Sequence, residues 1–199
     1  MVKVNVTSNN TNEKNKVRWY VMRAYKCEGK AEEKLKGEDG LDYYIPKRYT
    51  VQVYHGKKTR RLVPVIPNLI FVHASHSQII EFKQKCNFLQ FTMWKMSTGL
   101  EYLTVPDNQM SNFIKISSQY DEDLKYYKPE EIDFKKGTRV RIHGGQFDGL
   151  EGTFIKLKGT RSRQVVVKLD NIMAVSAQIH LDLIEVINEK SDNQPEETK

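Results

Sequence analysis

A glycine-rich stretch in the second half of the chain limits its possible folds more than any other feature. Residues 137–155 read Gly-Thr-Arg-Val-Arg-Ile-His-Gly-Gly-Gln-Phe-Asp-Gly-Leu-Glu-Gly-Thr-Phe-Ile. Apolar residues alternate with charged ones at its start, which predicts a strand with one buried face. The later glycines fit a turn and a close approach between backbones that a side chain would block. The positions that define this motif are Gly137, Val140, Ile142, Gly144, Gly145, Phe147, Gly149 and Gly152. An ordinary Gly-rich hairpin is the alternative for any one of these glycines.

The rest of this half contains further short strands and no helical period. The predicted strands are 138–143, 152–158, 163–169, 173–179 and 183–187, separated by Gly-rich or charged turns. Several short strands at close, even spacing are typical of a small β-barrel. We therefore expect an SH3-like barrel.

In the first half of the chain, predicted strands alternate with predicted helices. Strands are expected at 17–24, 43–53, 60–65, 69–73 and 88–94, and helices at 28–38, from Ser75 through Phe82, and from Pro106–Asp107 onward. Ser75 is a suitable N-cap, and a proline is favoured in the first turn of a helix. The expected fold class is α+β, with an α/β sandwich followed by the barrel.

Charge divides the chain into two basic blocks joined by an acidic segment. Residues 16–118 carry 17 basic and 9 acidic side chains, residues 119–133 carry 2 and 6, and residues 134–188 carry 9 and 5. This pattern predicts two domains with a linker at 119–133. The tails, 1–15 and 189–199, are polar and poor in apolar residues, so we expect them to be disordered.

Composition argues against several classes of protein. No run reaches the roughly 18 apolar residues of a membrane helix, and the N-terminus has no apolar signal segment. The two cysteines rule out a disulfide framework, and His73 and His76 lack further metal ligands nearby. No nucleophile elbow, P-loop or paired-carboxylate motif is present. We expect a cytoplasmic protein that binds rather than catalyses and needs no cofactor or metal.

The glycine motif resembles the KOW motif of ribosomal proteins and of NusG-type transcription factors. In the first block, Arg18-Trp19-Tyr20-Val21 and Ile66-Pro67-Asn68-Leu69-Ile70-Phe71-Val72 look like the NusG N-terminal (NGN) domain. An NGN domain, an acidic linker and a terminal KOW barrel form the architecture of the NusG family. The resemblance covers residues 16–188. Asn after the proline, where housekeeping members usually have Gly, is more similar to the specialised RfaH and UpxY antiterminators.

This resemblance implies a factor that docks on the clamp helices of RNA polymerase and reaches toward the gate-loop side. Such a factor suppresses pausing or termination and promotes transcription of long operons, such as those for polysaccharide biosynthesis. The residues expected to face the polymerase are Trp19, Ile66, Leu69, Phe71, Phe91 and Trp94. A polar contact to the gate loop is assigned to His76, Ser77 and Gln78. The alternative is that most of the apolar set belongs to the core.

Basic side chains and the barrel give further candidates. Non-template DNA or nascent RNA is the expected partner of Lys26, Lys30, Lys34, Lys57, Lys58, Arg60 and Arg61, with a solvated surface as the alternative. Contact to a ribosomal protein or to Rho is assigned to Asn171, Ile172 and Met173, which could instead cap the barrel. The rival hypothesis for the whole chain is a ribosome-associated KOW protein that binds RNA. That class predicts long basic tails, which this sequence lacks.

Overall fold

The computed structural model describes residues 16–97, 99–119 and 123–187. The chain divides between residues 122 and 123 into two compact units, and each is described by itself. The predicted tails lie outside the described residues. None of the helices in the described part is long and apolar enough to cross a membrane.

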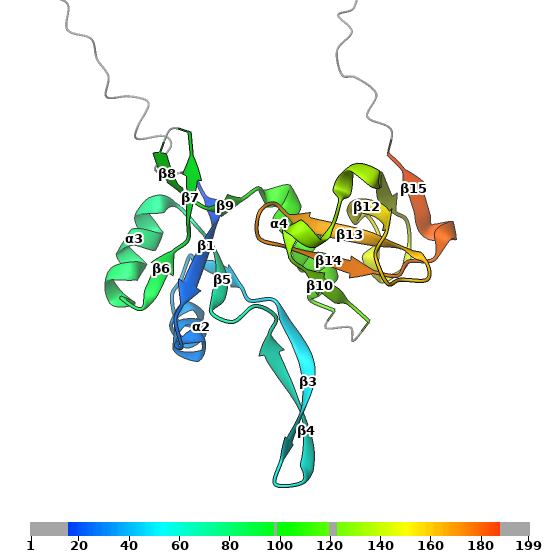
Figure 1. Ribbon diagram of the computed structural model, residues 1–199. Helices are drawn as coiled ribbons and strands as arrows, with labels where there is room; N and C mark the ends of the chain where they lie inside the picture. Colours follow the sequence, from blue (N-terminus) through cyan, green and yellow to red (C-terminus); the bar gives the residue numbers. More distant parts are fainter. Residues whose placement is uncertain (1–15, 98, 120–122, 188–199) are drawn as a thin grey trace, which may run out of the picture. The chain divides into compact units, whose positions relative to one another are not determined.

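The first unit is built on one antiparallel sheet (Figure 1). Its strand order is β2-β5-β1-β6, and β9 also pairs with β1. The strands are β1 (Arg18–Ala24), β2 (Asp42–Tyr44), β5 (Leu69–Ala74), β6 (Leu89–Phe91) and β9 (Thr104–Val105). β5 pairs with β1 along its full length, from Arg18↔Ala74 to Arg23↔Leu69. The central pair of the sheet is therefore also its longest.

Two helices, α2 (Glu28–Lys36) and α3 (His76–Lys85), pack on one face of this sheet. The core between them contains Met22 and Ile70 from the central strands, Leu35 from α2 and Phe82 from α3. These side chains are at most 2 % exposed, so this face is sealed.

A third helix, α4 (Asp107–Ser117), supplies one aromatic ring, that of Phe113, to the opposite face. Phe113 lies 6.3 Å from Phe71 and 6.4 Å from Tyr44 between ring centroids. The Tyr44 hydroxyl and Ser117 Oγ are 2.7 Å apart, which ties the end of α4 to β2. The helix begins after Pro106, as the sequence predicts.

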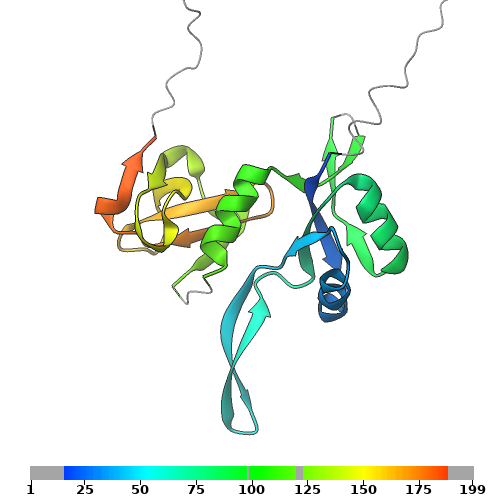
Figure 2. The same cartoon turned by 180° about the vertical axis from the view of Figure 1, so that it is seen from behind.

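Two hairpins extend this unit. β3 (Lys47–Tyr54) pairs with β4 (Lys57–Pro64), and β7 (Met93–Met96) pairs with β8 (Gly99–Tyr102). The β3–β4 hairpin projects away from the sheet as a narrow two-stranded ribbon (Figures 1 and 2). The predicted continuous strand 43–53 is thus divided at Pro46, which has no N–H to donate to a ladder. The predicted strand 88–94 is likewise divided, at Thr92.

The second unit is a curled six-stranded antiparallel sheet, the β-rich fold that the glycine motif predicts (Figure 1). Its order is β10-β14-β13-β12-β11-β15. The strands are β10 (Lys125–Tyr127), β11 (Thr138–Ile142), β12 (Glu151–Lys156), β13 (Arg163–Leu169), β14 (Met173–Ala177) and β15 (Ile184–Val186). β10 lies inside the predicted linker 119–133 and pairs with β14, so that part of the linker belongs to the sheet.

The glycine motif has the conformation expected from its sequence. Val140 and Ile142 are buried on one side of β11, and Phe147 is buried at the following turn. Gly144 has a φ of +83°, which a side chain would strain. At Gly152 an added Cβ would lie 2.9 Å from the carbonyl oxygen of Val166, so the two strands approach too closely for any side chain. The fold-class prediction, α+β followed by a β-rich unit, is confirmed.

Candidate functional site

Four aromatic rings from different elements meet at one side of the first unit. Tyr20 comes from β1, His76 from α3, Phe91 from β6 and Tyr102 from β8. The ring centroids of Phe91 and Tyr102 are 4.4 Å apart, those of His76 and Tyr102 5.3 Å, and those of Tyr20 and Phe91 5.7 Å. Tyr20 lies innermost, and its burial raises the pKa of its phenol, with Arg18 acting in the opposite direction. The structure therefore joins two predicted contact residues, His76 and Phe91, in one cluster.

The β7–β8 hairpin continues this cluster with exposed apolar side chains. Met93 is 42 % exposed, Trp94 41 %, Leu100 69 % and Tyr102 38 %. Met93 is paired with Tyr102, whereas Trp94 is paired with Glu101 on the other side of the hairpin. We call the rings His76, Phe91 and Tyr102, together with Met93 and Leu100 on the same side of the hairpin and Trp94 on its other side, the aromatic edge. Gathered apolar surface of this kind marks interaction sites in soluble proteins.

Two residues predicted to face a partner lie inside the unit. Leu69 is 2 % exposed and Phe71 is fully buried. Phe71 packs against Phe113 of α4, so it serves as a core residue in this structure. Ile66, just before β5, is half-buried.

The Pro67–Asn68 segment holds β5 against the connection between β1 and α2. Asn68 has a φ of +68°, and its Oδ1 accepts a hydrogen bond from the backbone N–H of Lys26 at 2.8 Å. The Asn68 N–H donates to the Glu28 carboxylate, and its carbonyl accepts from the N–H of Ala24 at 2.9 Å. Asn68 thus makes three hydrogen bonds that join the start of β5 to the connection between β1 and α2. We call this residue the Asn68 latch. Sequence reasoning treated this asparagine as a marker of a subfamily and missed its structural role.

Trp19 is half-buried and stacks on His73, with ring centroids 4.7 Å apart and planes at 22°. The two ring nitrogens of His73 lie 3.7 Å from Asp42 and 3.5 Å from Asp107. This arrangement links β1, β2, β5 and α4. His73 and His76 have different neighbours, and no group of His, Cys, Asp and Glu within the described residues could hold a metal ion.

The three residues assigned to a gate-loop contact lie in the first turn of α3. The Ser75 hydroxyl accepts from the N–H of Gln78 at 3.3 Å, and the Gln78 Oε1 accepts from the N–H of Ser75 at 2.9 Å. This is a capping box, as expected from the predicted N-cap. Ser77 Oγ lies 3.1 Å from Ser75 Oγ. The side chain of Gln78 is thus engaged in capping α3, while that of His76 belongs to the aromatic edge.

On α2, the predicted basic residues remain at the surface while neighbouring acids have other partners. Glu32 Oε1 and Oε2 each accept from Lys47 Nζ at 2.8 Å. Burial raises the pKa of Glu32, but the hydrogen bonds and charges of Lys47 and Lys36 together outweigh it, so the pKa is lowered overall. Lys30 and Lys34, one helical turn apart, are exposed and make no ion pair with the residues that the structure describes.

A second basic set lies on the β3–β4 ribbon. Lys57, Lys58, Arg60 and Arg61 are all exposed there. Lys26, the remaining basic candidate, is exposed at the latch. The structure therefore divides the basic candidates between the α2 region and the ribbon.

The turn between β13 and β14 contains the predicted partner site of the barrel. Asn171 is exposed with a φ of +61°, a conformation that asparagine tolerates. Ile172 is half-buried, whereas Met173 is only 1 % exposed and pairs with Leu169. Met173 is thus a core residue in this structure, and the reachable part of the turn is Asn171 with Ile172.

The described residues form an α+β unit and a β-rich unit whose surfaces carry exposed aromatic, aliphatic and basic side chains. Such surfaces suit a protein that binds other macromolecules. Comparison with known proteins gives a more specific class. Residues 17–114 match the family described as "Transcription termination factor nusG". This match covers just under half of the chain and coincides with the first unit.

Among solved structures, the chain is similar to one titled "Domain interaction in Thermotoga maritima NusG". The two share 20% sequence identity over 87% of this chain and 98% of that chain, with a TM-score of 0.43. No curated protein matches the chain.

Proposed function

We propose that the protein is a transcription elongation factor of the NusG family that binds RNA polymerase through its first unit. The observation that carries this proposal is the family match over residues 17–114. The family consists of transcription factors rather than enzymes. A cytoplasmic location and a KOW identity for the second unit follow from the same proposal.

The aromatic edge is the surface best suited to dock on the clamp helices of the polymerase. It combines side chains that are 38–69 % exposed with rings already packed against one another. Preformed aromatic anchors lose little freedom on binding and are favoured at interface hot spots. Leu69 and Phe71 are buried, with Phe71 against α4, and Trp19 stacks on His73, so in this proposal contact falls to Trp94, Leu100 and Tyr102 instead.

A factor held in this way would bridge the two sides of the DNA cleft, keep the clamp closed and so suppress pausing or termination. Lys26, Lys30 and Lys34 would lie beside exposed non-template DNA or nascent RNA and neutralise its phosphates. The Pro67–Asn68 sequence supports the narrower proposal of a specialised RfaH- or UpxY-like antiterminator acting on long operons. The exposed turn at Asn171 would offer the barrel's contact to a ribosomal protein or to Rho.

The deciding experiment is co-purification of core RNA polymerase with the tagged full chain. We expect the double variant Trp94→Ala/Leu100→Ala to recover at least about tenfold less polymerase, the loss typical of removed hot-spot side chains. Tyr25→Ala is the matched control, because Tyr25 is 61 % exposed in the same unit but lies outside the aromatic edge. Equal recovery for both variants would contradict docking at this surface. Recovery of ribosomes without polymerase would favour the ribosome-associated alternative.

The specialised role has its own test. Deletion of the gene followed by transcript profiling should reduce only the distal genes of one long operon. A change in pausing across all genes would contradict specialisation while leaving polymerase binding intact.

A further inference from the structure

The β3–β4 ribbon projects from the sheet of the first unit (Figure 1), and its shape is set by the pairing of its own two strands. β3 and β4 pair without a break from Lys47↔Pro64 to Lys57↔Tyr54. The connecting residues His55 and Gly56 have φ values of +47° and +75°, as in the two-residue turns that match the twist of a hairpin. Eight residues per strand give a length of roughly 26 Å. Most side chains along this length are exposed, on both faces of the ribbon.

The ribbon contains most of the positive excess of the chain. Residues 47–64 include six lysines and arginines and no acidic residue, in a protein whose net charge is +7. Arg48, Lys57, Lys58 and Arg61 make no ion pair with any residue that the structure describes. Charge concentrated in this way on a projecting element favours an anionic partner.

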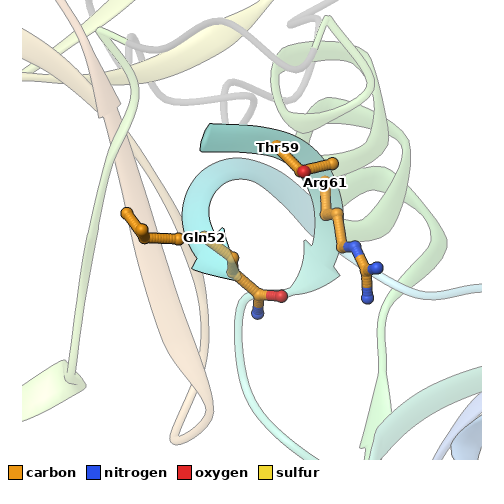
Figure 3. Close-up of a pocket in the computed structure, with 4 residues that line it drawn as sticks. Gln52, Thr59 and Arg61 are labelled. Atoms are coloured by element: carbon orange, nitrogen blue, oxygen red, sulfur yellow. The ribbon is translucent and has the colours of Figure 1, made fainter. Parts of the chain in front are cut away.

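The two faces of the ribbon differ in chemistry. Cross-strand partners share a face, so the pairs Thr50↔Arg61 and Gln52↔Thr59 lie together with Arg48. Gln52 and Arg61 extend on the same side, and a hollow of about 410 Å³ is lined by Gln52, Val53, Thr59 and Arg61 (Figure 3). The pairs Arg48↔Val63 and Tyr54↔Lys57 continue this face toward its two ends. We call Arg48, Thr50, Gln52, Thr59 and Arg61 the polar face.

The opposite face is largely apolar. Tyr49 is 40 % exposed, Val51 61 % and Leu62 37 %. The Arg60 guanidinium lies 4.0 Å from the centroid of the Tyr49 ring, so this cation is held against its own ribbon. The other cations of this face are Lys58 and, at its base, Lys47, which is paired with Glu32.

We propose that the ribbon binds double-stranded DNA by placing its polar face in the major groove. The major groove of B-form DNA, about 12 Å wide, admits a two-stranded β-ribbon. Arginine and glutamine are side chains that donate to guanine and adenine edges there, and threonine can contact bases or phosphates. Lys57, next to the turn, would reach the phosphate backbone.

Other nucleic acids fit this face less well. The major groove of double-stranded RNA is deep and narrow, so a ribbon cannot enter it. Single strands are bound mainly by stacking on aromatic rings. Tyr49 lies on the opposite face, already beneath Arg60. The register also places Tyr54, paired with Lys57, on the side of the polar face. The duplex preference therefore rests on the arginine, glutamine and threonine side chains that this face offers to base edges.

This inference goes beyond the proposed function, which needs contact with polymerase and with exposed single strands only. DNA binding by the purified full chain is measured without polymerase, and polymerase recovery is measured without DNA. Failure of either proposal is thus visible separately.

The test is fluorescence anisotropy of the full chain with a labelled 20-base-pair DNA duplex, its single strand, and an RNA duplex of the same sequence. Arg48→Gln/Arg61→Gln removes two charges from the polar face, and Lys58→Gln/Arg60→Gln removes two from the opposite face. We expect the duplex to bind at least about tenfold more tightly than the other two nucleic acids. The first variant should lose about a hundredfold in affinity and the second only a few-fold.

Equal losses in the two variants would mean diffuse electrostatic attraction and would overturn the proposal. Preference for the single strand or for RNA, or no binding to the duplex, would overturn it as well. All four substituted positions are exposed, and unchanged tryptophan fluorescence and circular dichroism would verify that each variant is folded.

Discussion

The Asn68 latch allows a prediction whose size follows from the structure. Replacing Asn68 with Ala removes the hydrogen bond to the Lys26 N–H, worth about 0.5–1.5 kcal/mol net. It also forces alanine into the left-handed region, at about 1–2 kcal/mol. We therefore expect the free energy of unfolding to fall by about 1.5–3.5 kcal/mol. Asn68→Gly loses the same hydrogen bond without the backbone strain and should be about 1 kcal/mol more stable than Asn68→Ala.

Urea unfolding monitored by tryptophan fluorescence is the suitable assay. Both tryptophans, Trp19 and Trp94, belong to the first unit, so the signal follows the unit that contains Asn68. A loss of this size corresponds to a fall in Tm of about 4–8 °C per kcal/mol for a domain near 100 residues. If Asn68→Ala is as stable as Asn68→Gly, the argument from left-handed backbone is wrong. If both equal the wild type, the latch contributes nothing.

Three further predictions concern stability and reactivity. Gly152→Ala should destabilise the second unit by about 1–3 kcal/mol in thermal circular dichroism, because the added methyl group meets the Val166 carbonyl oxygen. Glu32→Gln should cost about 1 kcal/mol at pH 7. Pairing with Lys47 and Lys36 outweighs burial and lowers the pKa of Glu32 in the folded state. The stabilisation by Glu32 is therefore present above the unfolded pKa and should be lost as pH falls through the lowered folded pKa. An unchanged stability difference between wild type and variant at about pH 3 would contradict this. Burial also raises the pKa of the Cys86 thiol, so a thiol reagent at pH 8 should modify it only after denaturant is added, and rapid native labelling would refute this.

Helices and strands that depend on contacts between near neighbours in the sequence could be predicted, whereas those that depend on distant contacts could not. The start of α3 was readable because Ser75 and Gln78 cap it through contacts three residues apart. β10 was not, because the acidic segment around Lys125–Tyr127 reads as a linker and its strand forms only by pairing with β14, about fifty residues later. The sequence predicts one strand over 43–53 that includes Pro46, because nothing nearby indicates that the chain leaves the sheet at this proline.

The candidate site shows the same limit. β5 is apolar at successive positions, which indicates a strand covered on both faces. The sequence could not show that α4 provides Phe113 against Phe71, because that contact joins residues 42 positions apart. The resemblance to NusG proteins placed Leu69 and Phe71 at an interface, whereas the side chains at the surface here belong to the β7–β8 hairpin.

The two hairpins of the first unit differ in the kind of partner that they suit: β3–β4 suits an anionic partner and β7–β8 an apolar one. The β3–β4 ribbon has six cations and no acid, whereas residues 93–102 contain one lysine, one glutamate and several exposed apolar groups. Binding through counterion release weakens steeply with salt, while apolar docking does not. Raising salt from about 50 to 200 mM should therefore abolish DNA binding through the ribbon and leave polymerase docking nearly unchanged. A parallel loss of both activities would mean that the two hairpins do not act as separate surfaces.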